Sequence, residues 1–70
     1  MYILKEYIYG LTPDGISELK DVDVILSEDK ESLVRYIMNE TGDKDAWDYM
    51  RSSNTYKDAY HNKKYVIEEQ

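Results

Sequence analysis

The first nine residues, MYILKEYIY, constrain the fold of this chain most, because they would place apolar or aromatic side chains on both faces of a strand. One face would carry Tyr2, Leu4, Glu6 and Ile8, and the other Ile3, Lys5, Tyr7 and Tyr9. A helix can cover one face, and tyrosine suits a partly covered face because its ring packs while its hydroxyl stays in water. The chain has 70 residues and no cysteine. We therefore expect a single domain over residues 1–70, with a thin core and no disulfide framework.

A hairpin is predicted after this strand. The segment GLTPDG, residues 10–15, has the composition of a turn, since proline restricts φ and glycine accepts a positive φ. The segment DVDVIL, residues 21–26, then alternates as a second strand. Its two faces would carry Val22, Val24 and Leu26 on one side and Asp21, Asp23 and Ile25 on the other.

The next segment carries the clearest helical pattern of the chain. Ser27 is expected to be the N-cap, with Glu28 and Asp29 in a first turn whose dipole favours negative charge. Gly42 is expected to terminate the helix. The apolar stripe would consist of Leu33, Val34, Ile37 and Met38, and the opposite side would carry Asp29, Tyr36 and Glu40.

The last third of the chain predicts a short helix and one or two strands. In DKDAWDYM, residues 43–50, Asp43 or Asp45 would cap a helix that places Ala46, Trp47 and Met50 against the core. Two alternatives stay open for TYKDAY, residues 55–60: a strand that forms a hairpin with KYVIEE, residues 64–69, or a continued helix. The expected fold class is α+β, with a small antiparallel sheet packed on one main helix in the order ββα, short helix, C-terminal strand or hairpin.

The charges indicate which partners to expect. Fifteen acids and nine bases give a net charge of −6, which argues against direct binding to nucleic acid or to an anionic membrane. Residues 14–31 hold seven acids and two bases, residues 40–48 four acids and one base, and residues 51–64 four bases and one acid. Solubility alone accounts for a net charge of this size. Since the sequence also shows no membrane span and no leader pattern, we expect a soluble cytoplasmic protein.

The sequence offers little for catalysis or metal binding. His61 is the only histidine and falls in an expected turn, without a cysteine or a serine nucleophile motif beside it. The run that begins at Asp43 starts like a calcium loop, but Asp48 stands where the loop needs glycine and Asn54 where it needs glutamate. Strand alternation and helix capping account for the carboxylates, so we expect no enzyme activity, no cofactor and no metal.

Protein binding is the function class that remains. The chain has eight tyrosines and no phenylalanine. Tyrosine is enriched at interfaces, although tyrosines that simply cover a solvent-exposed sheet face would explain this tyrosine content equally well. Carboxylates on a rigid scaffold can present a field similar to that of phosphates, and exposed tyrosines can supply stacking contacts. The residues expected to contact a partner are Asp29, Tyr36, Glu40, Asp43, Asp45, Asp48 and Tyr49.

A resemblance narrows this expectation. The strand that begins at Met1, the segment ILSEDKESLVRYI (residues 25–37) and the final YVIEE (residues 65–69) resemble small accessory proteins of bacteriophages and mobile elements of Gram-positive bacteria. The resemblance implies an inhibitor that acts inside the host bacterial cell and occupies the basic, nucleic-acid-binding surface of a host or defence protein, such as a CRISPR or restriction nuclease.

The alternative is a self-associating module, a homodimer. In that case the acidic residues 14–31 of one copy would meet the basic residues 51–64 of another, and sheet tyrosines would seal a two-fold interface.

Overall fold

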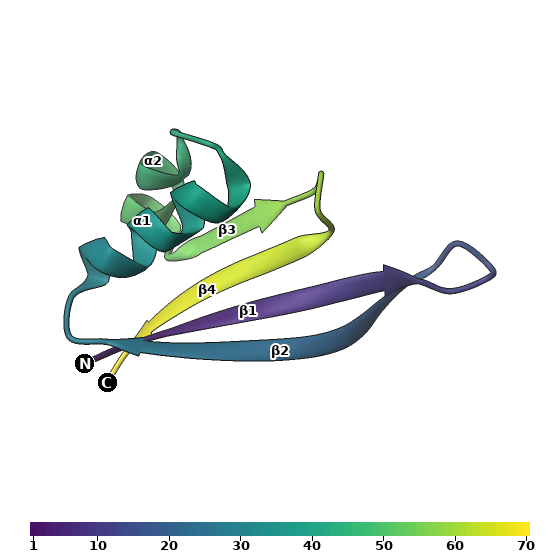
Figure 1. Cartoon of the computed structure of the whole chain (residues 1–70), viewed down its shortest axis with the longest axis horizontal. Helices are drawn as coiled ribbons and strands as arrows, with labels where there is room; N and C mark the ends of the chain where they lie inside the picture. Colours follow the sequence, from purple (N-terminus) through teal and green to yellow (C-terminus); the bar gives the residue numbers. More distant parts are fainter.

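The computed structural model describes residues 1–70 and consists of a four-stranded antiparallel sheet with two helices on one of its faces (Figure 1). The elements are β1 (Tyr2–Leu11), β2 (Ser17–Ser27), α1 (Lys30–Thr41), α2 (Ala46–Ser53), β3 (Thr55–Asp58) and β4 (Lys63–Glu69). The strand order is β2-β1-β4-β3, so the first and last strands of the chain lie side by side in the centre of the sheet. The predicted α+β class is confirmed.

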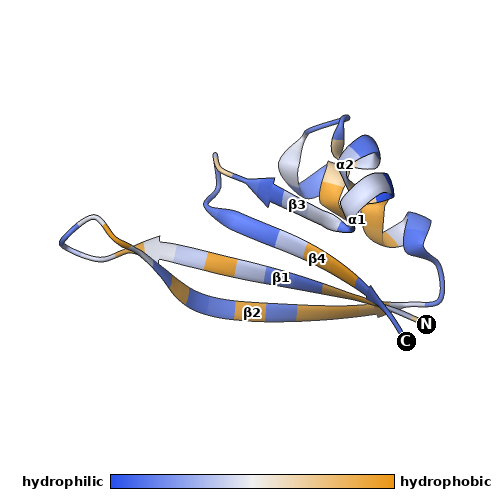
Figure 2. Cartoon of the chain, turned by 180° about the vertical axis from the view of Figure 1, so that it is seen from behind, coloured by the Kyte–Doolittle hydropathy of each residue, from blue (hydrophilic) through white to orange (hydrophobic).

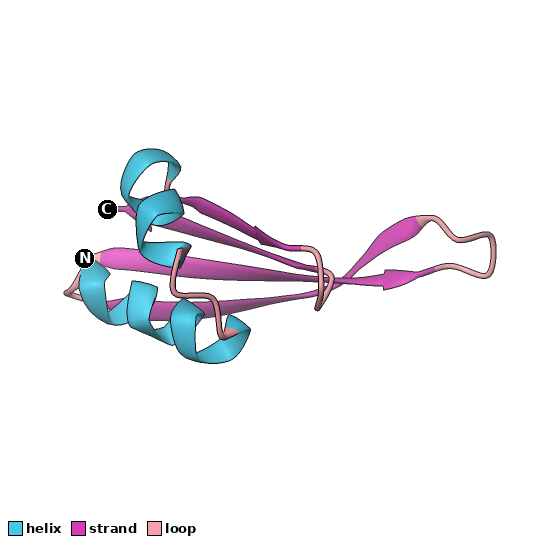
Figure 3. Cartoon of the chain, turned by 90° about the horizontal axis from the view of Figure 1, so that it is seen from above, coloured by secondary structure: helices cyan, strands magenta, loops and turns pink.

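The hairpin of β1 and β2 is longer than the sequence pattern predicted. β2 has 11 residues and begins at Ser17, whereas the prediction placed it over residues 21–26. The far end of the hairpin extends beyond the helices (Figure 3). Between Ile8 and Tyr9 the register shifts, which leaves Lys20 as an extra residue in β2. This bulge marks the point where the hairpin leaves the body of the sheet, because bulges bend the strand that carries them.

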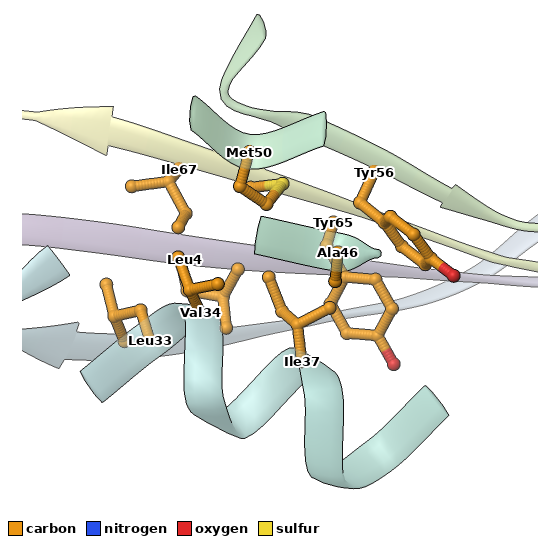
Figure 4. Packing of buried hydrophobic residues seen from close by; sticks show 9 residues of the cluster. All are labelled: Leu4, Leu33, Val34, Ile37, Ala46, Met50, Tyr56, Tyr65 and Ile67. Atoms are coloured by element: carbon orange, nitrogen blue, oxygen red, sulfur yellow. The ribbon is translucent and has the colours of Figure 1, made fainter. Parts of the chain in front are cut away.

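The core lies between α1, α2 and the inner face of the sheet (Figure 4). The predicted stripe of α1 is confirmed, although Met38 at its edge is only half-buried. Ala46 and Met50 of α2 are buried as predicted, and Trp47 packs against the core from its rim. The buried cluster consists of Leu4, Leu33, Val34, Ile37, Ala46, Met50, Tyr56, Tyr65 and Ile67.

Helix α1 begins two residues later than predicted. Asp29, and not Ser27, is the N-cap: its backbone is extended, with φ −123° and ψ 115°, and its side chain accepts a hydrogen bond from the Glu31 N–H. The prediction was wrong because β2 continues through Ser27, so the backbone cannot turn into a helix there. The Ser27 hydroxyl instead bonds to the backbone of Asp29.

Gly42 ends α1 in the left-handed conformation, with φ 71°, and its N–H donates to the Met38 carbonyl. We expect Gly42→Ala to lower the free energy of unfolding by about 1 kcal/mol, because a Cβ is disfavoured at this φ. Gly42→Asn is the matched control and should cost less, since asparagine tolerates this conformation. Urea unfolding of both variants tests the prediction, and equal losses would contradict it.

The C-terminal segment forms the predicted hairpin of β3 and β4, and the alternative of a continued helix is wrong. Asn54 ends α2 with φ 55°, and the chain then pairs Tyr56 with Tyr65 across the two strands. A helix would place Tyr56 and Tyr60 on one face. In the structure Tyr56 is buried and Tyr60 is 91% exposed, because only the strand residue points toward the helices.

Candidate functional site

The two faces of the sheet differ in what covers them. Both helices lie on the inner face, and no element covers the opposite face, which we call the open face (Figure 1). The strand register places the side chains of the open face in three rows across the strands. The first row is Leu26, Ile3 and Glu68; the middle row is Val24, Lys5, Val66 and Thr55; the third row is Val22, Tyr7, Lys64 and Lys57.

The open face carries apolar side chains that nothing in the chain covers. Val24 is 57% exposed and Leu26 is 61% exposed, and Val22 beside them is also exposed. Figure 2 shows hydrophobic bands alternating with hydrophilic bands along β2, the strand that carries all three. An antiparallel sheet with one solvated face usually presents polar residues to water. This face is therefore typical of a surface that contacts another molecule.

The open face is also basic, in contrast to the chain as a whole. It carries three lysines and one glutamate, a net charge of +2, so the rest of the chain carries −6 − 2 = −8. Lys5 pairs with Glu68 at 3.1 Å. Lys57 and Lys64 stand directly opposite each other on β3 and β4, and neither forms an ion pair. Like charges in directly opposed positions destabilise a sheet, so these lysines lack the counter-charge that would offset their repulsion.

The inner face holds a buried carboxylate that explains part of the tyrosine content. Glu6 is 3% exposed and accepts hydrogen bonds from the hydroxyls of Tyr36 and Tyr65, both at 3.3 Å. The Lys63 ammonium lies 3.1 Å from the same carboxylate. Burial raises the pKa of Tyr36 to about 12, and the charge of Glu6 adds to the rise. Burial and Glu6 likewise raise the pKa of Tyr65. Phenylalanine at positions 36 and 65 would leave this carboxylate with Lys63 as its one side-chain donor.

A second tyrosine–carboxylate pair connects β3 with the start of α2. The Tyr56 hydroxyl donates to Asp43 at 2.5 Å, and the other Asp43 oxygen accepts the Asp45 N–H at 2.9 Å. These two hydrogen bonds lower the pKa of Asp43, with the bond from Tyr56 as the larger cause. Burial, followed by the bond to Asp43, raises the pKa of Tyr56 to about 12. Asp43 therefore organises the turn between the helices.

The hydrogen bond between Tyr56 and Asp43 predicts that the free energy of unfolding falls at alkaline pH. Because the folded chain favours the neutral phenol of Tyr56, the stabilisation is complete below its ordinary pKa of 10 and is lost as the pH rises through about 12. A rise of about two pKa units corresponds to about 3 kcal/mol. We expect Tyr56→Phe to reduce the fall in unfolding free energy between about pH 9 and pH 12, measured by urea unfolding. An unchanged pH dependence would contradict the prediction.

The seven residues predicted to contact a partner fall into two groups in the structure. Three are engaged within the chain: Asp29 caps α1, Tyr36 bonds to Glu6, and Asp43 bonds to Tyr56. The other four, Glu40, Asp45, Asp48 and Tyr49, are exposed on the helical side of the molecule. The seven residues therefore do not form one free surface.

The sequence prediction missed Glu6 and the opposed lysines. The signal for Glu6 was present, because a glutamate between Leu4 and Ile8 on an apolar strand face is predicted to be buried. No local signal marks Lys57 and Lys64 as neighbours, since their contact depends on the pairing of β3 with β4.

His61 has a structural position in the turn between β3 and β4. Its Nδ1 lies 2.6 Å from the carboxylate of Asp58, a buried residue that also accepts the His61 N–H at 3.2 Å. The structure contains no group of three histidine, cysteine, aspartate or glutamate side chains arranged to hold a metal ion. Neither helix is long and apolar enough to cross a membrane.

Comparisons with protein-family models, with curated proteins and with solved structures find no match for this chain. The fold and the surface define its class: a small α+β domain whose sheet is covered by helices on one face and carries exposed apolar residues and unpaired lysines on the other.

Proposed function

We propose that this chain is a non-catalytic protein-binding protein whose contact surface is the open face of its sheet. The observation that carries the proposal is the exposure of Val24 and Leu26, at 57% and 61%, in a continuous face with Ile3 and Val66. Covering such side chains contributes roughly 25 cal/mol per Å² of apolar area. The occupant is a protein surface with apolar side chains and at least one carboxylate that meets Lys64.

Charge favours a protein over a nucleic acid as this occupant. Although the open face has a charge of +2, the remainder of the chain carries −8 within a molecule whose longest extent is 40 Å. A polyanion that approached the two unpaired lysines would be repelled by these carboxylates, because the shortest extent of the molecule, 19 Å, is little more than two Debye lengths of roughly 8 Å. A protein can present a single carboxylate without this cost.

Site-specific photo-crosslinking tests the proposal. A benzophenone amino acid is placed at Val24 on the open face and, as the matched control, at Asn39, which is exposed on α1. We expect protein adducts from position 24 in producing cells and their loss when Val22→Asp is added. Absence of adducts from position 24, or adducts that Val22→Asp leaves unchanged, would overturn the proposal.

A second candidate is the acidic contact surface predicted from the sequence, with a basic nucleic-acid-binding groove of a partner protein as its target. It rests on Glu40, Asp45 and Asp48, which are exposed and form no ion pair. Adducts from position 39 alone would favour this candidate. Replacement of all three acids by lysine should then abolish those adducts. Asp43 is left unchanged in this test, because its replacement would also remove the hydrogen bond from Tyr56 and could unfold the chain.

A further inference from the structure

We infer that the open face binds a second copy of this chain, sheet on sheet, in an antiparallel two-fold dimer. The inference rests on the proposed function, because it names the occupant of the same face. Its basis is the order of the three rows of side chains defined above, which becomes self-complementary under one particular two-fold axis.

The axis runs between the two sheets, across the strands and over the middle row. Rotation by half a turn about this axis places each strand of one copy over the same strand of the other copy, but in the opposite direction. The first row of one copy therefore covers the third row of the other. Apolar groups then meet apolar groups, since Leu26 covers Val22 and Ile3 covers Tyr7 of the second copy. Val24 lies next to its own equivalent at the axis. Aligned sheets that pack about 10 Å apart bury side chains in this manner.

The same axis brings Glu68 of each copy over a lysine of the other, and Lys5 lies next to its own equivalent on the axis, where its ion pair with Glu68 of the same chain offsets the like-charge contact. Glu68, the only acid of the open face, covers Lys64 of the second copy, and the pairing occurs twice because of the symmetry. Lys64 thereby gains the counter-charge that it lacks beside Lys57. The other face-to-face axis, parallel to the strands, places Lys57 over Val22 and Glu68 over Ile3, so that charges would be buried against apolar groups.

The size of the face predicts a reversible dimer. Four strands about 4.8 Å apart and about seven residues long, at about 3.3 Å per residue, give roughly 400 Å² of sheet per copy. That is about 800 Å² over both copies, which is less than a stable specific interface buries and is typical of weak, transient association. The charge of −6 on each copy also opposes association. We therefore expect half-dissociation at protein concentrations on the order of tens of micromolar.

Sedimentation equilibrium of the full chain tests the inference from about 1 µM to about 1 mM at physiological salt. The expected result is a rise from the monomer mass of 8.3 kDa to twice that value. Val24→Asp sets two carboxylates side by side at the axis and should abolish the rise. Asn39→Asp adds the same charge on α1 and should leave it unchanged. A wild-type chain that stays monomeric over the whole range overturns the inference.

A charge swap tests the geometry of the dimer. Lys64→Glu and Glu68→Lys should each weaken association about tenfold, because each creates a like-charge contact across the axis, and the double variant should restore most of the loss. Lys44→Glu and Glu40→Lys change the net charge equally on the helical side and should have little effect. Failure of the double variant to associate better than the single variants would overturn the two-fold arrangement. Circular dichroism confirms that each variant is folded.

The two proposals fail in distinguishable ways. A monomeric wild-type chain whose position 24 still crosslinks to a different protein would overturn the second copy as the occupant and leave the protein-binding function standing. A monomeric chain without adducts from position 24 would overturn both. Adducts of twice the chain mass, together with the charge-swap rescue, would support both.

Discussion

Glu6→Ala is expected to lower the free energy of unfolding by about 3 kcal/mol, a large part of the stability of so small a domain. The carboxylate is 3% exposed and accepts from Tyr36, Tyr65 and Lys63. Its removal leaves the hydroxyl of Tyr65, a residue only 1% exposed, without an acceptor beneath α1. The ammonium of Lys63 loses its partner as well, although part of that loss is recovered because Lys63 can turn toward water.

Glu6→Gln is the matched control for this prediction. The amide keeps one acceptor oxygen for the tyrosine hydroxyls and loses the charge that pairs with Lys63, so we expect about half of the effect. Urea unfolding at neutral pH measures both variants. A cost for Glu6→Ala that is no larger than the cost for Glu6→Gln would show that the tyrosine hydroxyls find other partners, and would contradict the assigned role of the carboxylate.

Leu4→Ala is expected to cost about 3 kcal/mol, whereas Leu26→Ala should cost less than about 0.5 kcal/mol in dilute solution. The two leucines lie on neighbouring strands but on opposite faces of the sheet. Leu4 is fully buried against the helices, and Leu26 is 61% exposed on the open face. Both substitutions delete the same atoms. The difference between their unfolding free energies therefore measures the effect of burial beneath the helices and not an effect of side-chain chemistry.

Urea unfolding of both leucine variants at low micromolar concentration makes the comparison in the monomer. Equal costs would show that the open face is covered within the chain, contrary to the structure. At concentrations where the dimer forms, Leu26→Ala should also weaken association, since Leu26 covers Val22 of the second copy. Leu4→Ala should affect association only through unfolding.

Local patterns were sufficient to predict most of the secondary structure. The stripe that includes Leu33 and Ile37, with Gly42 after it, predicted α1 because helix periodicity and a left-handed C′ residue are local properties. Strand alternation predicted the first hairpin, but for residues 55–60 it left both a strand and a continued helix open. The start of α1 was wrong because it depends on how far β2 pairs with β1, and that pairing decides between Ser27 and Asp29 as the N-cap.

The candidate surface was only partly predictable. The sequence showed that the first strand has two apolar faces and that one of them needs a cover from outside the strand. It also indicated carboxylates available for a partner, but Asp29 and Asp43 are engaged in hydrogen bonds within the chain. The basic character of the open face was not predictable, because Lys57 and Lys64 become neighbours only when β3 and β4 pair.

The sequence by itself determined the α+β class, the main helix, the first hairpin and the excess of tyrosine over phenylalanine, since all of these follow from composition and short-range periodicity. Only the tertiary structure decided which face of β1 the helices cover. Both faces are apolar enough to be buried, and the choice follows from the docking of α1 over Leu4 and Ile67. That choice turns Glu6 inward to the tyrosine hydroxyls and leaves Val24, Lys64 and their neighbours on the face that no helix covers.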